Sequence, residues 1–295
     1  MKSLKDNVVI GTWPLSGDFG RKGLASSPID VITSAIESGF RRFDSAPNYG
    51  YGAGEEILGK ALQRVDNTCV EFSTKLGNHV SGVKNFNQEC MRQTFENTFQ
   101  KFGCMPSSAL IHNPRHSPNE LEDLVGEITT WLPPKVKLGI SLAKDTKYPN
   151  SILNMFEYIQ IDANYLYRHP IESEKLSTQA RSILGSGLLM RQCTPGSLVF
   201  DTDDHRASWV VGERKQLINK KLQSFDHACA TWKVSRFEAC LLLGLVYGGF
   251  NSCVVGIKNH LHLKQLDSFL SKDIDWVTKK QVSDLRKELC IDSGF

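Results

Sequence analysis

Two hydrophobic periods alternate along this chain. Short apolar runs rich in β-branched residues predict strands, and longer stretches with apolar residues three and four positions apart predict helices. The predicted strands are residues 8–12, 41–43, 70–76, 108–112, 136–141, 158–162, 178–184 and 252–255. The predicted helices are residues 28–38, 55–63, 87–102, 119–131, 148–155, 213–232, 236–247, 261–270 and 277–288.

The order of these elements indicates an α/β fold built from repeated strand-then-helix units. The connections are too long for hairpins, so neighbouring strands should pair in parallel and close into a (β/α)8 TIM barrel. We expect a single catalytic domain over residues 1–295 with extra helices. A doubly wound open sheet is the second choice on pattern alone, but no Gly-x-Gly-x-x-Gly follows the first strand. The sixth unit has little room for a helix after Asn164.

The segment after the second predicted strand carries the first candidate chemistry. Asp44 ends the strand and Tyr49 follows five residues later, in a loop that also contains Gly50, Gly52 and Gly54. Such a composition stops a strand and predicts a turn. A turn whose Asp caps the next helix explains this segment as well as catalysis does, so other strand ends must decide.

Further polar groups stand at the ends of the next strands. Lys75 lies near the end of the third, His112 ends the fourth, Ser141 ends the fifth, and the sixth carries Gln160. A Tyr that donates a proton, a Lys that lowers the phenol pKa, an Asp that keeps the Lys charged and a His that orients a carbonyl suit proton transfer. Alone, each has an ordinary structural explanation, but together they favour a catalytic site.

Composition narrows the class of protein. The hydrophobic share of 40% and the charged share of 23% are typical of a soluble globular protein, and a net charge of +3 gives no reason to expect nucleic acid or a membrane as partner. No signal peptide or apolar run of about 18 residues is visible, so we expect a cytoplasmic protein. The eight cysteines show no Cys-x-x-Cys spacing and are interpreted as reduced, mostly buried thiols such as Cys240 and Cys253, not as a metal site.

The motifs resemble those of the aldo-keto reductase superfamily, in order and at the expected strands. The segments that carry the resemblance are 11–13, 43–50, 55–62, 73–75, 110–112, 139–141, Gln160 with Asn164, 184–189 and 203–206.

The resemblance implies NAD(P)H-dependent reduction of an aldehyde or ketone, or the reverse oxidation. Hydride would come from the nicotinamide and the proton from Tyr49, with His112 orienting the carbonyl and with Asp44 and Lys75 tuning the phenol. Tyr51 competes for the role of acid, but the offset from Asp44 favours Tyr49.

The resemblance also implies a set of cofactor contacts. The expected residues are Gly11, Thr12, Trp13, Ser141, Gln160, Leu184, Gly185, Ser186, Gly256, Lys258, His262 and Gln265. The chain departs from the family pattern at Leu142, where many members have Asn, and at His262, where many have Arg. Gln265 and Leu266 stand where Glu and Asn often clamp the adenine. NADPH is favoured, and NADH stays open because Lys258 lacks the bidentate fork of Arg.

The substrate is expected to be a small carbonyl compound in an open polar pocket, which suits a sugar or another hydroxylated carbonyl better than a steroid. Candidate lining residues are Trp13, Tyr51, His79, Trp209 and the loop 115–117. A monomer is favoured. The alternatives are a weakly catalytic NADP(H)-binding regulatory or partner-binding barrel and a metal-dependent hydrolase; for the latter, His112 stands alone at the strand ends.

Overall fold

Eight parallel strands close into a barrel. The computed structural model describes residues 4–20, 23–167, 176–191, 198–246 and 249–272. The strands pair in sequence order and β1 pairs with β8, which confirms the barrel and rules out the open sheet. Their bounds are β1 (Val8–Gly11), β2 (Arg42–Asp44), β3 (Glu71–Leu76), β4 (Ser108–His112), β5 (Lys137–Ser141), β6 (Tyr158–Asp162), β7 (Thr178–Arg181) and β8 (Ser252–Gly256).

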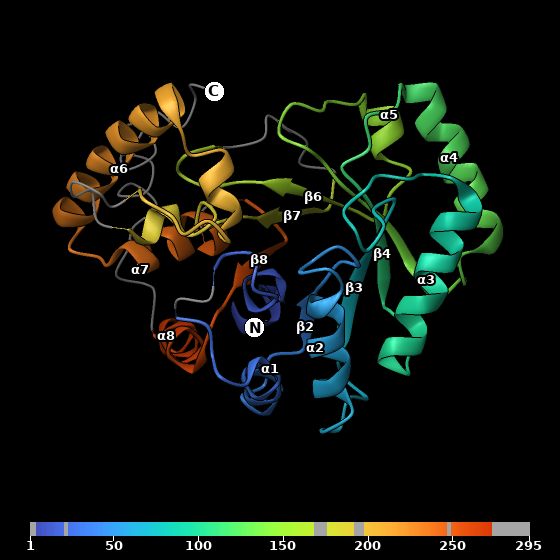
Figure 1. Ribbon diagram of the computed structural model, residues 1–295, viewed down its shortest axis with the longest axis horizontal. Helices are drawn as coiled ribbons and strands as arrows, with labels where there is room; N and C mark the ends of the chain where they lie inside the picture. The colour runs from blue at the N-terminus through green and yellow to red at the C-terminus, as the bar shows by residue number, and fades with distance from the viewer. Residues whose placement is uncertain (1–3, 21–22, 168–175, 192–197, 247–248, 273–295) are drawn as a thin grey trace.

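Helices surround the barrel (Figure 1), with α3 and α4 on one side and α6 and α7 on the opposite side. The bounds are α1 (Pro28–Glu37), α2 (Ala53–Leu62), α3 (Gln88–Phe102), α4 (Pro118–Trp131), α5 (Asn150–Leu153), α6 (Gly212–Trp232), α7 (Arg236–Leu241) and α8 (His260–Leu270). Short 3-10 turns cover Leu4–Asn7, Trp13–Leu15, Leu188–Met190 and His205–Ser208, and a π-helical turn, Leu242–Val246, continues α7.

Side-chain caps fix where several helices begin. The Ser27 hydroxyl accepts from Asp30 N–H at the start of α1, with Pro28 in the first turn. The side chain of Asn87 caps α3 in the same way. A capping box between Ser117 and Glu120 starts α4. Such caps satisfy N–H groups that the first turn of a helix leaves without a partner.

The structure differs from the sequence prediction mainly in three elements. Strand β7 stops at Arg181 instead of Leu184, because Ser182 has a φ of +56° and turns the chain. Helix α5 has only four residues. Helix α7 gives way to the π-helical turn after Leu241. In the described parts of the β6–β7 connection, residues 163–167 and 176–177, there is no helix, in line with the little room expected there. The predicted helix 277–288 lies outside the described residues.

The barrel interior is unusually polar. Barrels of this kind are commonly filled by branched apolar side chains. Here Lys75, Ser73, Ser141, Gln160 and Gln179 are all buried, while the apolar core lies mainly between the strands and the helices. Buried polar groups need partners, so the interior must hold a hydrogen-bond network.

Glu55 joins three elements beneath the loop that carries Tyr49. Its carboxylate is fully buried and accepts from Thr74 Oγ1 of β3 at 2.7 Å and from Thr98 Oγ1 of α3 at 2.9 Å. Lys101 Nζ lies 3.0 Å from its second oxygen. The first turn of α2 is thereby held against β3 and α3, which fixes the end of the preceding loop.

The cysteines only partly match the expectation of buried thiols. Cys229, Cys240 and Cys253 are buried, whereas Cys69 and Cys90 are exposed, so the prediction was wrong for those two. Both exposed cysteines lie at the polar margins of elements, just before β3 and in the first turn of α3. Among the described helices, none has the length and apolar character needed to cross a membrane.

Candidate active site

The carboxyl ends of β2 and β3 bring Asp44 and Lys75 together. Lys75 Nζ lies 2.7 Å and 2.8 Å from the two carboxylate oxygens of Asp44, and it also donates to the carbonyl of Ser45 at 2.9 Å. The Lys75 side chain is completely buried and that of Asp44 is nearly so. The pair of charges is therefore shielded from water.

Two neutral donors complete the surroundings of the Asp44 carboxylate. Ser73 Oγ donates to Oδ2 at 2.9 Å, and Gln160 Nε2 donates to the same oxygen at 3.0 Å. Gln160 Nε2 also donates to Gln179 Oε1 at 2.7 Å. Both amide protons of Gln160 are therefore directed into the barrel, so in this structure Gln160 supports the carboxylate.

Tyr49 lies beside this ion pair. Lys75 Nζ is 5.0 Å from the centroid of the Tyr49 ring, and the ring stacks on Trp13 with centroids 5.3 Å apart. Burial raises the pKa of Tyr49, while the positive charges of Lys75 and Arg181 lower it; burial outweighs them, so the pKa stays above its usual value. Tyr51 is 80% exposed, so the two tyrosines differ sharply in surroundings.

The loop between β2 and α2 has close contacts that set the position of Tyr49. Asp18 Oδ2 accepts from Gly50 N–H at 2.9 Å and from Trp13 Nε1 at 2.7 Å. Gly50 has a φ of +56°, and a Cβ there would lie 2.4 Å from the carbonyl oxygen of Ser16. Only glycine fits this turn without strain. Trp13 and the Tyr49 loop are thus held by one carboxylate.

His112 ends β4 and faces the Tyr49 ring edge to face, with centroids 6.3 Å apart. Asn78 Nδ2 lies 2.8 Å from His112 Nδ1. Because the Asn78 amide donates, Nδ1 accepts and the neutral imidazole carries its proton on Nε2. Burial and the charges of Lys75 and Arg181 hold the pKa of His112 well below its usual value. The ring is therefore a neutral hydrogen-bond donor.

Arg181 is a site residue that the sequence reasoning missed. It ends β7, and its guanidinium crosses the barrel mouth to donate to Ser141 Oγ at the end of β5. Nη2 lies 2.7 Å from the Leu142 carbonyl oxygen, 3.1 Å from Asn113 Oδ1 and 3.1 Å from Asp162 Oδ2. The arginine is visible in the sequence, but the strand was predicted to continue to Leu184, so Arg181 was not counted among the residues at strand ends.

The remaining candidate cofactor residues lie at the same rim, around β1, β7 and β8. Gly11 and Gly256 are paired neighbours at the ends of β1 and β8. Thr12 is buried and donates to Ser45 Oγ at 2.8 Å. After β7 the backbone takes positive φ at Ser182, Gly185, Ser186 and Gly187. Within this turn, Gly185 N–H donates to the Ser182 carbonyl oxygen at 2.7 Å and Gly187 N–H donates to the Leu184 carbonyl oxygen at 3.0 Å.

The start of α8 brings three further candidates close together. Lys258 Nζ donates to the carbonyl oxygens of Phe19 at 2.8 Å and Gly20 at 2.9 Å. His262 Nδ1 accepts from Lys258 N–H at 3.3 Å, and Gln265 follows one turn later on an exposed face. Lys258 therefore anchors the loop after β1, in addition to placing its charge near the start of a helix.

Aromatic side chains form a wall beside Tyr49. The His205 ring lies 5.0 Å from Trp13 and 4.4 Å from Phe19, centroid to centroid, and Trp209 lies 6.3 Å from His205. Of the other candidate lining residues, Tyr51 and His79 are exposed. In the loop 115–117, Arg115 pairs with Asp145 at 3.0 Å and Ser117 caps α4.

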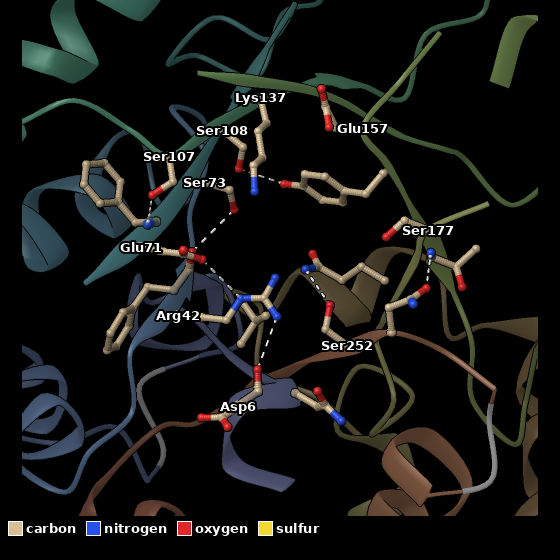
Figure 2. Close-up of a pocket in the computed structure, with 18 residues that line it drawn as sticks. Asp6, Arg42, Glu71, Ser73, Ser107, Ser108, Lys137, Glu157, Ser177 and Ser252 are labelled. Atoms are coloured by element: carbon tan, nitrogen blue, oxygen red, sulfur yellow. Dashed lines mark hydrogen bonds and ion pairs between the residues drawn. The ribbon is translucent and has the colours of Figure 1, made fainter. Parts of the chain in front are cut away.

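A separate cavity of about 260 Å³ lies at the opposite end of the barrel, where the strands begin. Figure 2 shows polar side chains converging there, among them Arg42 and Glu71, which form an ion pair at 3.6 Å. None of the four catalytic candidates lines this cavity. Within the described residues, no three His, Cys, Asp or Glu side chains are grouped to hold a metal ion.

The geometry defines a closed parallel barrel with a buried Asp–Lys–Tyr group and a neutral His at its carboxyl rim. Residues 7–129 match the model of the Aldo/keto reductase family. This match contains all four catalytic candidates, and it confirms the family resemblance that the motifs indicate.

Curated relatives match over short segments. The chain is 37% identical to aldo-keto reductase YhdN of Bacillus subtilis over 56 residues, 19% of this chain and 17% of that protein. It is 40% identical to pyridoxal 4-dehydrogenase of Microbacterium luteolum over 68 residues, 23% of this chain and 19% of that protein. It is 29% identical to NADH-specific methylglyoxal reductase of Escherichia coli over 109 residues, 32% of this chain and 33% of that protein. The aligned segments thus span at most a third of these relatives.

Solved structures match over nearly the whole chain. A glycerol dehydrogenase from Gluconobacter oxydans has a TM-score of 0.72 and 19% identity, covering 97% of this chain and 93% of that one. An aldo-keto reductase from Bacillus halodurans has a TM-score of 0.72 and 16% identity, covering 98% and 93%. At these identities the likeness establishes the fold.

Proposed function

We propose that the protein is an NAD(P)H-dependent oxidoreductase that reduces an aldehyde or ketone to an alcohol. The observation that carries the proposal is the buried group of Tyr49, Lys75 and Asp44 beside a neutral His112. Proton transfer to a carbonyl oxygen needs an acid that is positioned, shielded and electrostatically tuned, and these residues meet all three needs.

Tyr49 serves as the proton donor. Its pKa above the usual value keeps the phenol protonated at neutral pH, and the charge of Lys75 stabilises the phenolate left after transfer. His112 donates from Nε2 to the carbonyl oxygen and so orients it. Asp44 keeps Lys75 charged. Tyr51, exposed to solvent, lacks these partners.

The rim fits a dinucleotide. Loops after the seventh and eighth strands of such barrels commonly bind phosphate together with a helix N-terminus. Here the positive-φ turn at Gly185 and Ser186 follows β7, and α8 begins just after Lys258. Bound there, the nicotinamide would supply hydride. Leu184, Gly185 and Ser186 would face the pyrophosphate, and Lys258 with His262 and Gln265 the adenosine end. Ser141, which the resemblance assigns to the carboxamide, is engaged inside the barrel, because its hydroxyl donates to Gln160 Oε1 at 3.0 Å and accepts from Arg181.

NADPH is the favoured cofactor, with NADH as the alternative. Lys258 supplies one positive charge near the start of α8, but two of its donors are engaged by Phe19 and Gly20. The Escherichia coli relative is named as NADH-specific. Comparing the two dinucleotides in one fluorescence titration decides between them.

The substrate is proposed to be a small hydroxylated carbonyl compound. Trp13 and His205 present flat aromatic faces beside Tyr49, against which a small compound can pack. The names of the relatives mention pyridoxal, methylglyoxal and glycerol, all small and polar. Turnover with a panel of aldoses, simple aldehydes and steroid ketones tests this, and a preference for the steroids would contradict it.

The decisive experiment compares Tyr49→Phe with Tyr51→Phe. Tyr49→Phe should lower kcat for aldehyde reduction by about 10²-fold or more, while the dissociation constant for NADPH changes little. Tyr51→Phe serves as the matched control and should keep near wild-type turnover. Equal activity of Tyr49→Phe and wild type would overturn the role of Tyr49. Absence of binding of either dinucleotide to wild type would overturn the proposed function.

A further inference from the structure

Arg181 is a buried charge at the carboxyl rim that the proposed mechanism does not use. Its side chain is 15% exposed. An arginine is costly to bury and keeps its charge at any physiological pH. Hydrogen bonds to four acceptors compensate for this burial; the acceptors are Ser141, Leu142, Asn113 and Asp162. The guanidinium is thereby locked across the barrel mouth, which indicates a positional role.

The locked guanidinium lies next to the proton-transfer residues. Asn113, one of its acceptors, directly follows His112, and Ser141 is the register partner of His112 between β4 and β5. The charge of Arg181 also lowers the pKa of both Tyr49 and His112. A positive charge at this position therefore acts electrostatically on a cofactor ring that reacts beside Tyr49.

We propose that Arg181 makes the site discriminate by charge between the two oxidation states of the nicotinamide, so that the reduced dinucleotide binds more tightly than the oxidised one. This inference rests on the proposed function. Reacting atoms must approach to about 3–3.5 Å, so a nicotinamide that transfers hydride beside Tyr49 lies near the guanidinium. The reduced ring is neutral and the oxidised ring is cationic, and only the cation is repelled.

Asp162 determines how strongly the charge of Arg181 discriminates between the oxidised and the reduced nicotinamide. Its carboxylate lies 3.1 Å from Arg181 Nη2 and is 9% exposed, so it offsets part of the guanidinium charge. Lys75 does not add an unbalanced charge, because Asp44 pairs with it. Removing Arg181 and removing Asp162 should therefore shift the discrimination in opposite directions.

The test measures the ratio of dissociation constants, oxidised over reduced, by fluorescence titration with NADP+ and NADPH, and with NAD+ and NADH. The phosphates and the adenosine are the same in both states of each pair, so their contributions cancel in the ratio. Arg181→Gln should lower the ratio about fivefold and Asp162→Asn should raise it about threefold. Arg181→Lys keeps the charge and should stay within about twofold of wild type.

Arg92→Gln, which removes an exposed arginine on α3 paired with Glu96, is the matched control and should leave the ratio unchanged. An unchanged ratio in both Arg181→Gln and Asp162→Asn, with dinucleotide still bound, would overturn this inference and leave the proposed function intact. If wild type binds none of the four dinucleotides, the proposed function itself fails, and this inference fails with it. Circular dichroism of each variant confirms that binding is measured on folded protein.

Discussion

Lys75 Nζ and Asp44 Oδ1 lie 2.7 Å apart inside the barrel, with side-chain exposures of 0% and 4%. Removing one member of such a buried pair leaves the other charge without a partner, whereas removing both is far less costly. Single and double variants of this pair therefore separate the electrostatic contribution to stability from the contribution of side-chain packing.

We expect Lys75→Met to lower the free energy of unfolding by about 3–5 kcal/mol, because the Asp44 carboxylate stays buried. The pKa of Tyr49 should rise further, since Lys75 lowers it. Urea denaturation checks the stability. The double variant Lys75→Met with Asp44→Leu is the control, and it should be more stable than Lys75→Met alone. If Lys75→Met were as stable as wild type, the loss of the partner of a buried Asp44 carboxylate would carry no cost, which would contradict this prediction.

Glu55→Gln should destabilise the fold by about 3 kcal/mol, because its fully buried carboxylate joins Thr74, Thr98 and Lys101. The neighbouring Glu56 pairs with Lys60 in solvent, at 60% and 54% exposure. Glu56→Gln should therefore change stability by less than about 0.5 kcal/mol. Thermal unfolding of the two variants side by side measures the difference; equal losses would contradict the clamping role of Glu55.

Gly54→Ala should disturb the site. A Cβ at Gly54 would lie 2.9 Å from Tyr49 Cβ and 3.1 Å from Thr12 Oγ1, so we expect a loss of about 1–3 kcal/mol from overpacking and a fall in turnover. At Gly126, inside α4, a Cβ meets no atom within 4 Å. Gly126→Ala should stabilise the protein by about 0.5–1 kcal/mol with activity unchanged. Denaturation midpoints and kcat of both variants test this contrast.

Acid pH should destabilise the protein partly through His112. Its folded pKa is well below the usual value because the ring is buried near Lys75 and Arg181. Below the unfolded pKa of about 6.5, the unfolded chain binds a proton that the folded chain does not. The contribution of His112 to stability is therefore complete above that pH and is lost as pH falls toward the folded pKa.

The measurement is the midpoint of urea unfolding between pH 4.5 and 7.5. Wild type should lose stability toward acid with a steeper slope than His112→Gln, by at most about 1.4 kcal/mol per pH unit. His205 and His262 also have lowered pKa values, so some slope should remain in the variant. Identical slopes in the two proteins would contradict a neutral, buried His112.

The sequence was sufficient for the barrel and for most strand positions. The ranges for β4 and β6 match the prediction residue for residue, since each is an apolar run bounded by turn residues. The elements that differed are the short ones. Helix α5 and the end of α7 depend on tertiary packing more than on local propensity, which periodicity does not report.

The candidate site was predictable as a set of residue types at strand ends. Its internal connections were not, because they join residues far apart in the sequence: Gln160 and Asp44 are 116 positions apart and meet only through the closed register of the barrel. Arg181 was missed for a local reason, the positive φ of Ser182, which ends β7 three residues before the predicted boundary. The functional assignment of these residues stays a prediction until the variants are measured.

The polar interior has a consequence for how the barrel selects its own register. Ser252, which lines the cavity where the strands begin (Figure 2), accepts from Gln179, Gln179 accepts from Gln160, and Gln160 donates to Asp44. A slip of one residue in any of these strands would turn its amide or hydroxyl out of the barrel and leave the others without partners. This column of hydrogen bonds, which ends at the Asp44 carboxylate, therefore also disfavours misfolded registers, so a substitution at one mouth of the barrel can shift a side chain at the other.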